Sequence, residues 1–150
     1  MGIRKHRKPI SMYLFIACGT WLIGLGIYFM FLRPALLPED LRYIGTSAGE
    51  IEAAMPGLES WTHRVFTVMG GFMLGTGVLT ILAAMNASAA PPKWTRIALG
   101  LAGVFTVGTM SLTNFQLNSD FKWLLLIPSV LWLIAMVFST VTNGRDGEAN

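Results

Sequence analysis

The chain has 150 residues, of which 53% are hydrophobic and only 13% are charged, with a formal net charge of +3 at pH 7. Soluble domains carry about 25% charged residues, so this chain is too poor in charge to cover a water-facing surface. Its single cysteine, Cys18, excludes an internal disulfide and a multi-cysteine zinc site. The basic residues cluster by loop, which indicates membrane topology rather than a nucleic-acid-binding surface.

Residues 12–32 form the first of four apolar stretches and contain no charged side chain. As a helix this stretch would be about 31 Å long, which matches a hydrocarbon core of about 30 Å. The basic leader at residues 4–8 is typical of a signal peptide. However, the apolar run exceeds the usual length of about 7–15 residues, and no A-x-A pattern follows Leu32. We therefore expect a retained membrane anchor.

Residues 33–64 are expected to form a long outer loop with its own structure. Ser47 and Glu50 have the S-x-x-E spacing of a capping box, and an apolar run follows. The pair Pro56-Gly57 would end that short helix. We interpret it as an interfacial helix that lies against the outer mouth of a helical bundle.

Three polar residues precede the second apolar stretch, at residues 65–85. Glu59 and His63 are four residues apart, so they share a face if the helix begins before Val65. A carboxylate beside an imidazole could move protons or hold a metal ion, although two ligands are too few for a defined zinc site. We keep Glu59, His63 and Arg64 as candidate ligand-binding residues, with a surface ion pair as the alternative.

Small residues at helical spacing mark candidate packing faces. They are Thr20 and Gly24 in the first span, Thr67, Gly71 and Gly75 in the second, and Gly103 in the third. Such faces let helix backbones approach closely, because lipid gives helices no hydrophobic reason to pair. Packing inside one bundle, a seam between two copies and a ligand groove all fit this pattern.

The third apolar stretch, residues 97–117, is the most polar of the four. Thr106 and Asn114 lie on one side of it, together with Met110 and Thr113. Threonine can bond to its own helix, but Asn114 should face another helix or water. Interhelical hydrogen bonding is one interpretation. The other is the polar wall of an outward-opening cavity, which makes Thr106 and Asn114 further candidate ligand-binding residues.

The fourth apolar stretch covers residues 121–141. Pro128 lies within it and is expected to kink the helix. The three residues from Asn118 to Asp120 leave room only for a tight turn, so the last two spans should form an antiparallel hairpin. A short inner turn around Pro91-Pro92 joins the second and third spans.

The distribution of charge predicts that both ends of the chain are cytoplasmic. With that orientation the inner segments hold Arg4, Lys5, Arg7, Lys8, Lys93, Arg96 and Arg145, and the outer segments hold Arg33, Arg42, Arg64 and Lys122. Acidic residues show the opposite bias. The expected location is the cytoplasmic (inner) membrane of a bacterium.

No predicted span carries a charged residue near its centre or a histidine. Ion-coupled transporters usually place ionisable groups within the membrane, and haem proteins usually present histidines within helices. Both classes are therefore disfavoured. We expect no catalytic residue, no metal site and no cofactor.

Several segments carry a resemblance to known proteins. They are residues 38–45 (PEDLRYIG), residues 50–58, Arg64, and the glycines at 70, 71, 75 and 77. With them the chain resembles a broad group of uncharacterised small bacterial membrane proteins of four helices, and its layout is similar to DoxX-type proteins. The resemblance implies a membrane location and a four-helix fold.

The sequence therefore predicts a single all-α membrane domain over residues 1–150, an antiparallel bundle of four transmembrane helices with a short interfacial helix. The leading functional hypothesis is a non-catalytic accessory or assembly subunit, whose partners beyond the lipid bilayer are other membrane subunits or a second copy. The alternatives are a small-molecule or lipid binding or transport protein with an outward-facing cavity, and a quinone-linked, DoxX-like oxidoreductase component.

Overall fold

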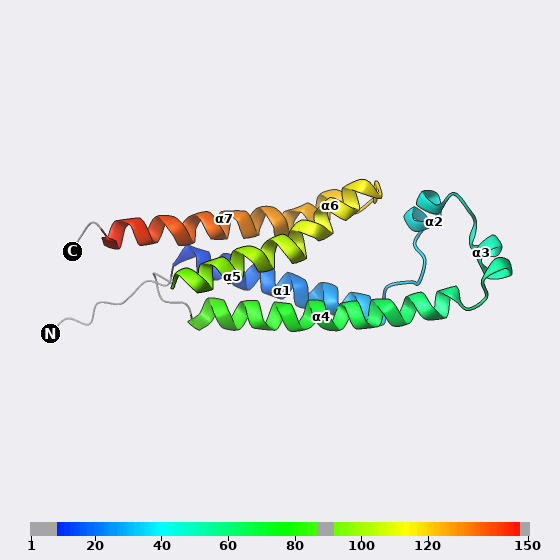
Figure 1. Ribbon diagram of the computed structural model, residues 1–150, viewed down its shortest axis with the longest axis horizontal. Helices are drawn as coiled ribbons and strands as arrows, with labels where there is room; N and C mark the ends of the chain where they lie inside the picture. Colours follow the sequence, from blue (N-terminus) through cyan, green and yellow to red (C-terminus); the bar gives the residue numbers. More distant parts are fainter. Residues whose placement is uncertain (1–8, 87–91, 148–150) are drawn as a thin grey trace.

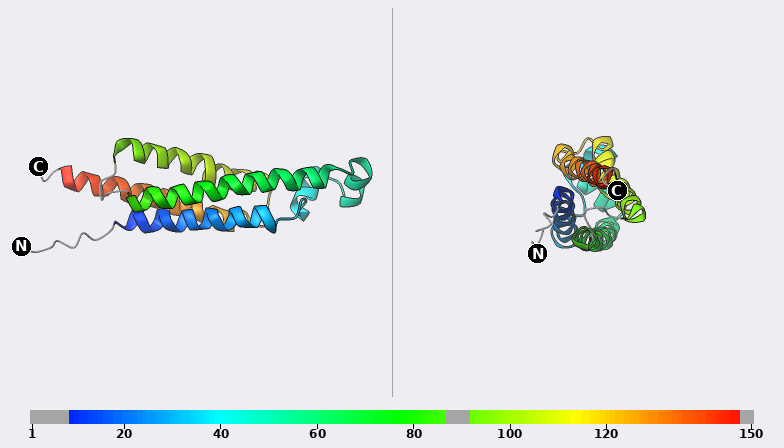
Figure 2. Two further views of the ribbon diagram at one scale, coloured as in Figure 1. Left: turned by 90° about the horizontal axis from the view of Figure 1, so that it is seen from below. Right: turned by 90° about the vertical axis from the view of Figure 1, so that its left-hand side faces the viewer.

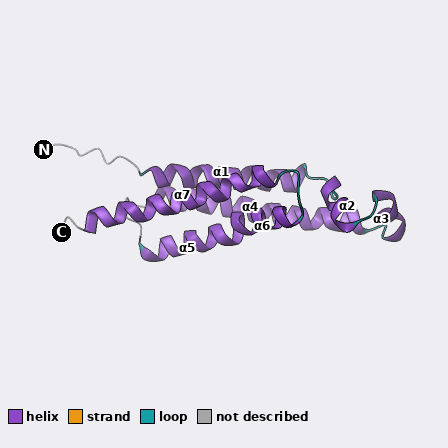
Figure 3. Ribbon diagram, turned by 90° about the horizontal axis from the view of Figure 1, so that it is seen from above, coloured by secondary structure: helices purple, strands orange, loops and turns teal. Residues whose placement is uncertain are grey.

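A computed structural model describes the backbone of residues 9–86 and 92–147 and the side chains as far as residue 140. Every regular element in these ranges is helical (Figures 1 and 3). The elements are α1 (Ile10–Phe31), α2 (Pro38–Ile44), α3 (Ala48–Ala54), α4 (Leu58–Asn86), α5 (Lys93–Gly103), the π-helical segment η1 (Val104–Gly108), α6 (Thr109–Gln116) and α7 (Lys122–Gly147).

Four helices are long and apolar enough to cross a membrane, which confirms the four predicted spans. They are Ile10–Phe31, Leu58–Asn86, Lys93–Gln116 and Lys122–Thr140. The second begins at Leu58 rather than Val65, because hydropathy marks where a helix meets lipid and polar residues can continue it into water. With 29 residues, α4 is about 43 Å long, well beyond the thickness of a hydrocarbon core.

The helices are arranged as two pairs that meet along one side. In one pair α4 packs along α1, and in the other α5, η1 and α6 pack along α7; α1 also packs against α7 (Figures 1 and 2). Among the described elements, α4 has no extensive packing against α5, α6 or α7. The start of α1 lies at one end of the molecule, and α2 and α3 lie at the other.

Two glycine pairs bring the backbones of α1 and α4 together. A Cβ at Gly70 would lie 2.6 Å from the carbonyl oxygen of Gly26, and a Cβ at Gly77 would lie 2.5 Å from that of Gly19. The two glycines on each helix are seven residues apart, or about two turns, so they share one face. At these four glycine positions the α1–α4 seam has no room for a Cβ atom unless a neighbour moves.

The predicted packing strips need a correction at this seam. A Cβ at Gly24, Gly71 or Gly75 would meet nothing within 4 Å. Thr20 and Thr67 bond to carbonyl oxygens of their own helices. Spacing by four residues does identify a small-residue face, but it does not show which face another helix covers. Within the described chain the seam lies on the neighbouring glycines.

The third and fourth spans are joined by a tryptophan that fills the space above a glycine. Trp132 is 2% exposed, and its indole N–H donates to the carbonyl oxygen of Leu99 at 3.0 Å. A Cβ at Gly103 would collide with this indole ring, so Gly103 does lie at a helix contact. Phe15 of α1 packs edge-on against the same ring, with centroids 5.5 Å apart.

Polar groups fill the contact between the third and fourth spans near Pro128. Ser129 donates to the carbonyl oxygen of Val107 at 2.7 Å, and Ser111 donates to that of Leu125 at 2.9 Å. The thiol of Cys18 lies 3.6 Å from the carbonyl oxygen of Pro128. The two serines thus add hydrogen-bond donors to carbonyl groups close to the proline and the π-helical segment, where the regular backbone pattern is interrupted.

The loop between α1 and α4, the predicted outer loop, contains two short helices, α2 and α3. The capping box is confirmed: the backbone N–H of Glu50 donates to Ser47 Oγ at 3.3 Å, and that of Ser47 donates to Glu50 Oε2 at 2.9 Å. The backbone N–H of Ser47 and the hydroxyl groups of Thr46 and Ser47 all donate to the Glu50 carboxylate, and these three bonds lower the pKa of Glu50. The other short helix, α2, was not predicted from the sequence; it begins with Pro38 and is capped after Ile44 by Gly45, whose φ is 78°.

Candidate functional site

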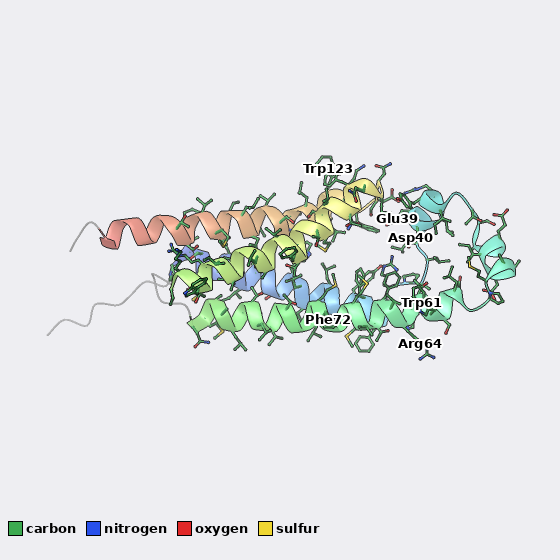
Figure 4. All side chains as sticks on the ribbon, viewed as in Figure 1. Glu39, Asp40, Trp61, Arg64, Phe72 and Trp123 are labelled. Atoms are coloured by element: carbon green, nitrogen blue, oxygen red, sulfur yellow. The ribbon has the colours of Figure 1, made fainter. Side chains whose placement is uncertain are left out.

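A cavity of about 880 Å³ lies where α4 and the third span do not pack against each other. Its walls come from α1, α4, η1, α6 and the start of α7, and residues of α2 line its outer end. Figure 4 shows Glu39 and Asp40 of α2 on the side of that helix that faces the bundle. This cavity is the candidate functional site.

The inner part of the cavity is apolar and built from flexible or aromatic side chains. Its walls include Leu22, Leu25, Met73, Phe105 and Met110, and Phe29 and Phe66 continue the apolar lining toward Arg33. Methionine is unbranched and polarisable, so it adapts to ligands of irregular shape. An apolar chain is therefore the chemical group that this part of the cavity fits.

The wall supplied by the third span carries the polar face identified in the sequence. Thr106 lines the cavity, and its hydroxyl donates to the carbonyl oxygen of Ala102 at 2.5 Å. Asn114 also lines it, and its Nδ2 donates to the carbonyl oxygen of Met110 at 2.9 Å. One of the two Nδ2–H groups is used within the helix, so the side chain of Asn114 can offer a ligand its second N–H as a donor and Oδ1 as an acceptor.

The π-helical segment η1 forms part of the same wall. Phe105 and Thr106 lie within it, and Thr109 follows directly. The widened turn is stabilised from both sides, because Thr109 donates to the carbonyl oxygen of Phe105 at 2.9 Å and Ser129 donates to that of Val107. Single π-helical turns occur frequently at functional sites. Nothing in the sequence signalled this one.

A buried arginine stands at the outer end of the cavity. Arg33 is 9% exposed, and its Nη2 lies 3.1 Å from Asp40 Oδ2. Its Nη1 donates to the carbonyl oxygen of Pro34 at 2.9 Å. The guanidinium also lies over the ring of Phe66, 3.6 Å from its centroid, and 5.3 Å from that of Phe29. These contacts fix the position of the positive charge.

Beside this ion pair lies a second carboxylate, Glu39, which is only 5% exposed. Its Oε1 accepts a hydrogen bond from Ser119 Oγ at 3.0 Å, and Ser119 Oγ in turn accepts from the backbone N–H of Phe121 at 3.2 Å. On the surface of the same helix, Arg42 pairs with Asp120 at 2.9 Å. The two contacts hold α2 against the α6–α7 turn, at the outer end of the cavity.

The predicted mouth at Glu59, His63 and Arg64 is wrong as a position for the cavity. All three side chains are exposed and none lines the cavity, and Figure 4 shows Arg64 on the outer side of α4. Within the described part of the chain no ion pair joins them to another residue. The helix begins early enough for Glu59 and His63 to share a face, but that face is turned to solvent.

The charged residues that the site does use had a weaker signal in the sequence. Arg33 directly follows an apolar run of membrane length, and Glu39 and Asp40 follow within two turns. Interfacial charges of this kind are common, so only the folded position of α2 distinguishes them. No group of three histidine, cysteine, aspartate or glutamate side chains suited to a metal ion occurs among the residues the structure describes.

The four apolar helices and the cavity between them define a multi-pass membrane protein. No family model, no curated protein and no solved structure matches the chain.

Proposed function

We propose that the protein binds or carries an amphipathic, lipid-like molecule in the cavity between α4 and the third span. The observation that supports this proposal is the combination of an apolar inner wall with charged groups at one end. A volume of about 880 Å³ lies within the range of ligand pockets, which is about 300–1,000 Å³. A single alkyl chain with a compact headgroup fits both the size and the polarity.

The proposed setting is the bacterial inner membrane, with the four spans as an antiparallel bundle and both ends in the cytoplasm. The clustering of arginine and lysine in the inner segments supports this orientation. In that setting α2 and α3 lie at the outer face, α3 is an interfacial helix, and the charged end of the cavity opens outward. The apolar chain of the ligand would then lie at the depth of the acyl chains.

A neutral photoreactive monoacylglycerol tests the proposal in nanodiscs of phosphatidylcholine. We expect it to label cavity residues such as Met73 and Met110, and the labelled peptides are mapped by mass spectrometry. Met110→Trp fills the cavity and should reduce labelling by about tenfold, the change produced by roughly 1.4 kcal/mol. Leu112→Trp is the matched control, because Leu112 lies two residues away on the same helix and is exposed.

Labelling that Met110→Trp leaves unchanged would contradict the proposal. So would labelling confined to exposed positions such as Leu112. A quinone recovered with the purified protein would favour the quinone-linked hypothesis instead, since a quinone would occupy the same apolar space.

A second candidate, an accessory subunit in a larger assembly, is favoured by the free glycine face of α4. Gly71 and Gly75 have nothing within 4 Å of their Cβ positions, so a helix of another protein could approach there closely. Gentle purification from native membranes tests this candidate. A monomer that carries no other protein would count against it, whereas Gly71→Leu should release a partner that is bound at this face.

A further inference from the structure

The outer end of the cavity carries an excess of negative charge. Arg33, Glu39 and Asp40 all line it, and they contribute one positive and two negative groups. Arg33 and Asp40 neutralise each other at 3.1 Å. The other described ion pair, between Arg42 and Asp120, is exposed and lies outside the cavity. Glu39 therefore has no cationic partner within 4.0 Å in the part of the chain that the structure describes.

Glu39 is nevertheless held in place with one oxygen atom free. Ser119 donates to its Oε1 at 3.0 Å, and Oε2 has no hydrogen-bond partner among the described residues. The side chain is 95% buried, as the 5% exposure of the residue indicates, and it lines the cavity. Among the described residues, Trp21 Nε1 is the only fully buried side-chain nitrogen or oxygen without a partner, so Glu39 Oε2 keeps accessible surface through which a cation or a hydrogen-bond donor can reach it. A carboxylate in such a largely buried setting favours a cationic partner.

An anionic headgroup is a poor fit to the same place. The guanidinium of Arg33 already contacts Asp40, the carbonyl oxygen of Pro34 and the ring of Phe66. An anion that reached it would also approach the carboxylates of Asp40 and Glu39. An alkyl chain with a positively charged, N–H-bearing end satisfies both the apolar wall and the open carboxylate oxygen.

We propose that the ligand is a lipophilic primary amine whose ammonium group binds the carboxylate of Glu39 while its alkyl chain occupies the apolar cavity. This inference rests on the proposed function and specifies the headgroup that the same site selects. The ammonium donates to Glu39 Oε2, and Ser119 keeps the carboxylate in position through Oε1. The source of the amine is either a free long-chain amine or the ethanolamine end of a membrane lipid.

Competition against the photoreactive monoacylglycerol tests the headgroup, with dodecylamine, dodecanol and dodecanoate as the three competitors. We expect dodecylamine to displace the probe at a roughly tenfold lower concentration than dodecanol, the scale of one charge-assisted hydrogen bond. Dodecanoate should be the weakest of the three. Phosphatidylethanolamine in the nanodisc should displace dodecylamine if the membrane lipid is the source, and should leave it bound if the source is a free amine.

Glu39→Gln removes the charge but keeps an oxygen atom that can accept from Ser119, so α2 should stay in place. In this variant the preference for dodecylamine over dodecanol should disappear, because displacement by dodecylamine weakens by more than displacement by dodecanol. Glu59→Gln, an exposed position on α4, should retain the preference. Since both variants are measured in the same bilayer, differences in partitioning of the three competitors cancel.

Persistence of the preference in Glu39→Gln, or tighter binding of dodecanoate than of dodecylamine, would overturn the inference and leave the proposed function intact. Failure of the photoreactive probe to label the cavity of the unmodified protein would overturn both. A Glu39→Asp variant keeps the negative charge, so it should retain a weaker preference for dodecylamine over dodecanol. This variant therefore distinguishes an effect of the charge from an effect on folding.

Discussion

The two sides of α4 differ in almost every respect. On the side of α1, Gly70 and Gly77 bring two backbones into direct contact. On the side of the third span, Phe66, Met69 and Met73 face an open volume of about 880 Å³. One side of α4 therefore has no room for a Cβ at Gly70 and Gly77, whereas the other side lines a cavity.

This difference separates the stability of the fold from its capacity to bind. Helix pairs in lipid gain their stability from close van der Waals contact, which small residues permit. A wall of methionine and phenylalanine leaves gaps that a ligand can fill. Substitutions on the two sides of α4 should thus affect different measurements, and the following predictions test that separation.

The largest effect is expected at the α1–α4 seam. Gly70→Leu would place side-chain atoms against the carbonyl oxygen of Gly26, and overpacking of this kind costs about 3 kcal/mol or more. Gly71→Leu, one residue along, meets open space and should change stability by less than about 0.5 kcal/mol. Thermal unfolding of both variants in detergent is the measurement. Equal melting temperatures would mean that the seam does not hold the two helices together.

A smaller loss of stability is expected where the third and fourth spans meet. Trp132→Phe removes the hydrogen bond to the carbonyl oxygen of Leu99, which should cost about 1–2 kcal/mol. Trp94→Phe, at an exposed position, is the control and should leave the melting temperature unchanged. A Trp132→Phe variant as stable as the control would show that this bond contributes nothing net.

On the open side of α4, added bulk should leave stability nearly unchanged. Met73→Trp extends into the cavity, so we expect a change in unfolding free energy of less than about 1 kcal/mol, because no packed neighbour must move. The same variant should lower labelling by the monoacylglycerol probe. Leu79→Trp, on the exposed side of α4, should alter neither measurement. If the melting temperature of Met73→Trp were as low as that of Gly70→Leu, the two sides of α4 would not differ in their tolerance of added bulk.

The smallest effect is local and depends on pH. The backbone N–H of Ser47 and two hydroxyl groups lower the pKa of Glu50, so its contribution is present above its ordinary pKa of 4.5 and is lost as the pH falls through the lowered value. Hydrogen exchange of the amides in α3, after correction for the intrinsic rate, should increase in that acidic range. Amides of the α1–α4 seam should keep their protection, and Ser47→Ala should weaken the dependence.

The part of the fold that the sequence predicted is the part that depends on composition and local spacing. Four membrane-length helices follow from four uncharged stretches, and α3 follows from the spacing of Ser47 and Glu50. Thr106 and Asn114 lie on the cavity wall because residues eight apart share a helix face. Hydropathy, capping and residue spacing each act within one helix, so they can be predicted without knowing how the helices pack.

The rest depends on which helix faces which, and that is not a local property. Gly70 and Gly71 are adjacent identical residues, and nothing in the sequence shows which of them faces α1, yet only Gly70 contacts that helix. Likewise, Glu59 precedes a span and Glu39 follows one, so the two look alike in the sequence. Only Glu39 is buried, because its carboxylate is bonded to Ser119, which lies eighty positions away in the chain. The charged end of the cavity was therefore predicted on the wrong residues.

The bond between Glu39 and Ser119 has a consequence for the order in which the chain is assembled. The contacts between α1 and α4 involve only residues up to Asn86, so they can form as soon as that part of the chain has been synthesised. The contacts that join α2 to the α6–α7 turn cannot form until Ser119 and Asp120 have been synthesised, whereas the Arg33–Asp40 pair and the contacts of α3 with α4 involve residues made earlier. The end of the cavity that α2 lines is therefore completed only after the α6–α7 turn has been made.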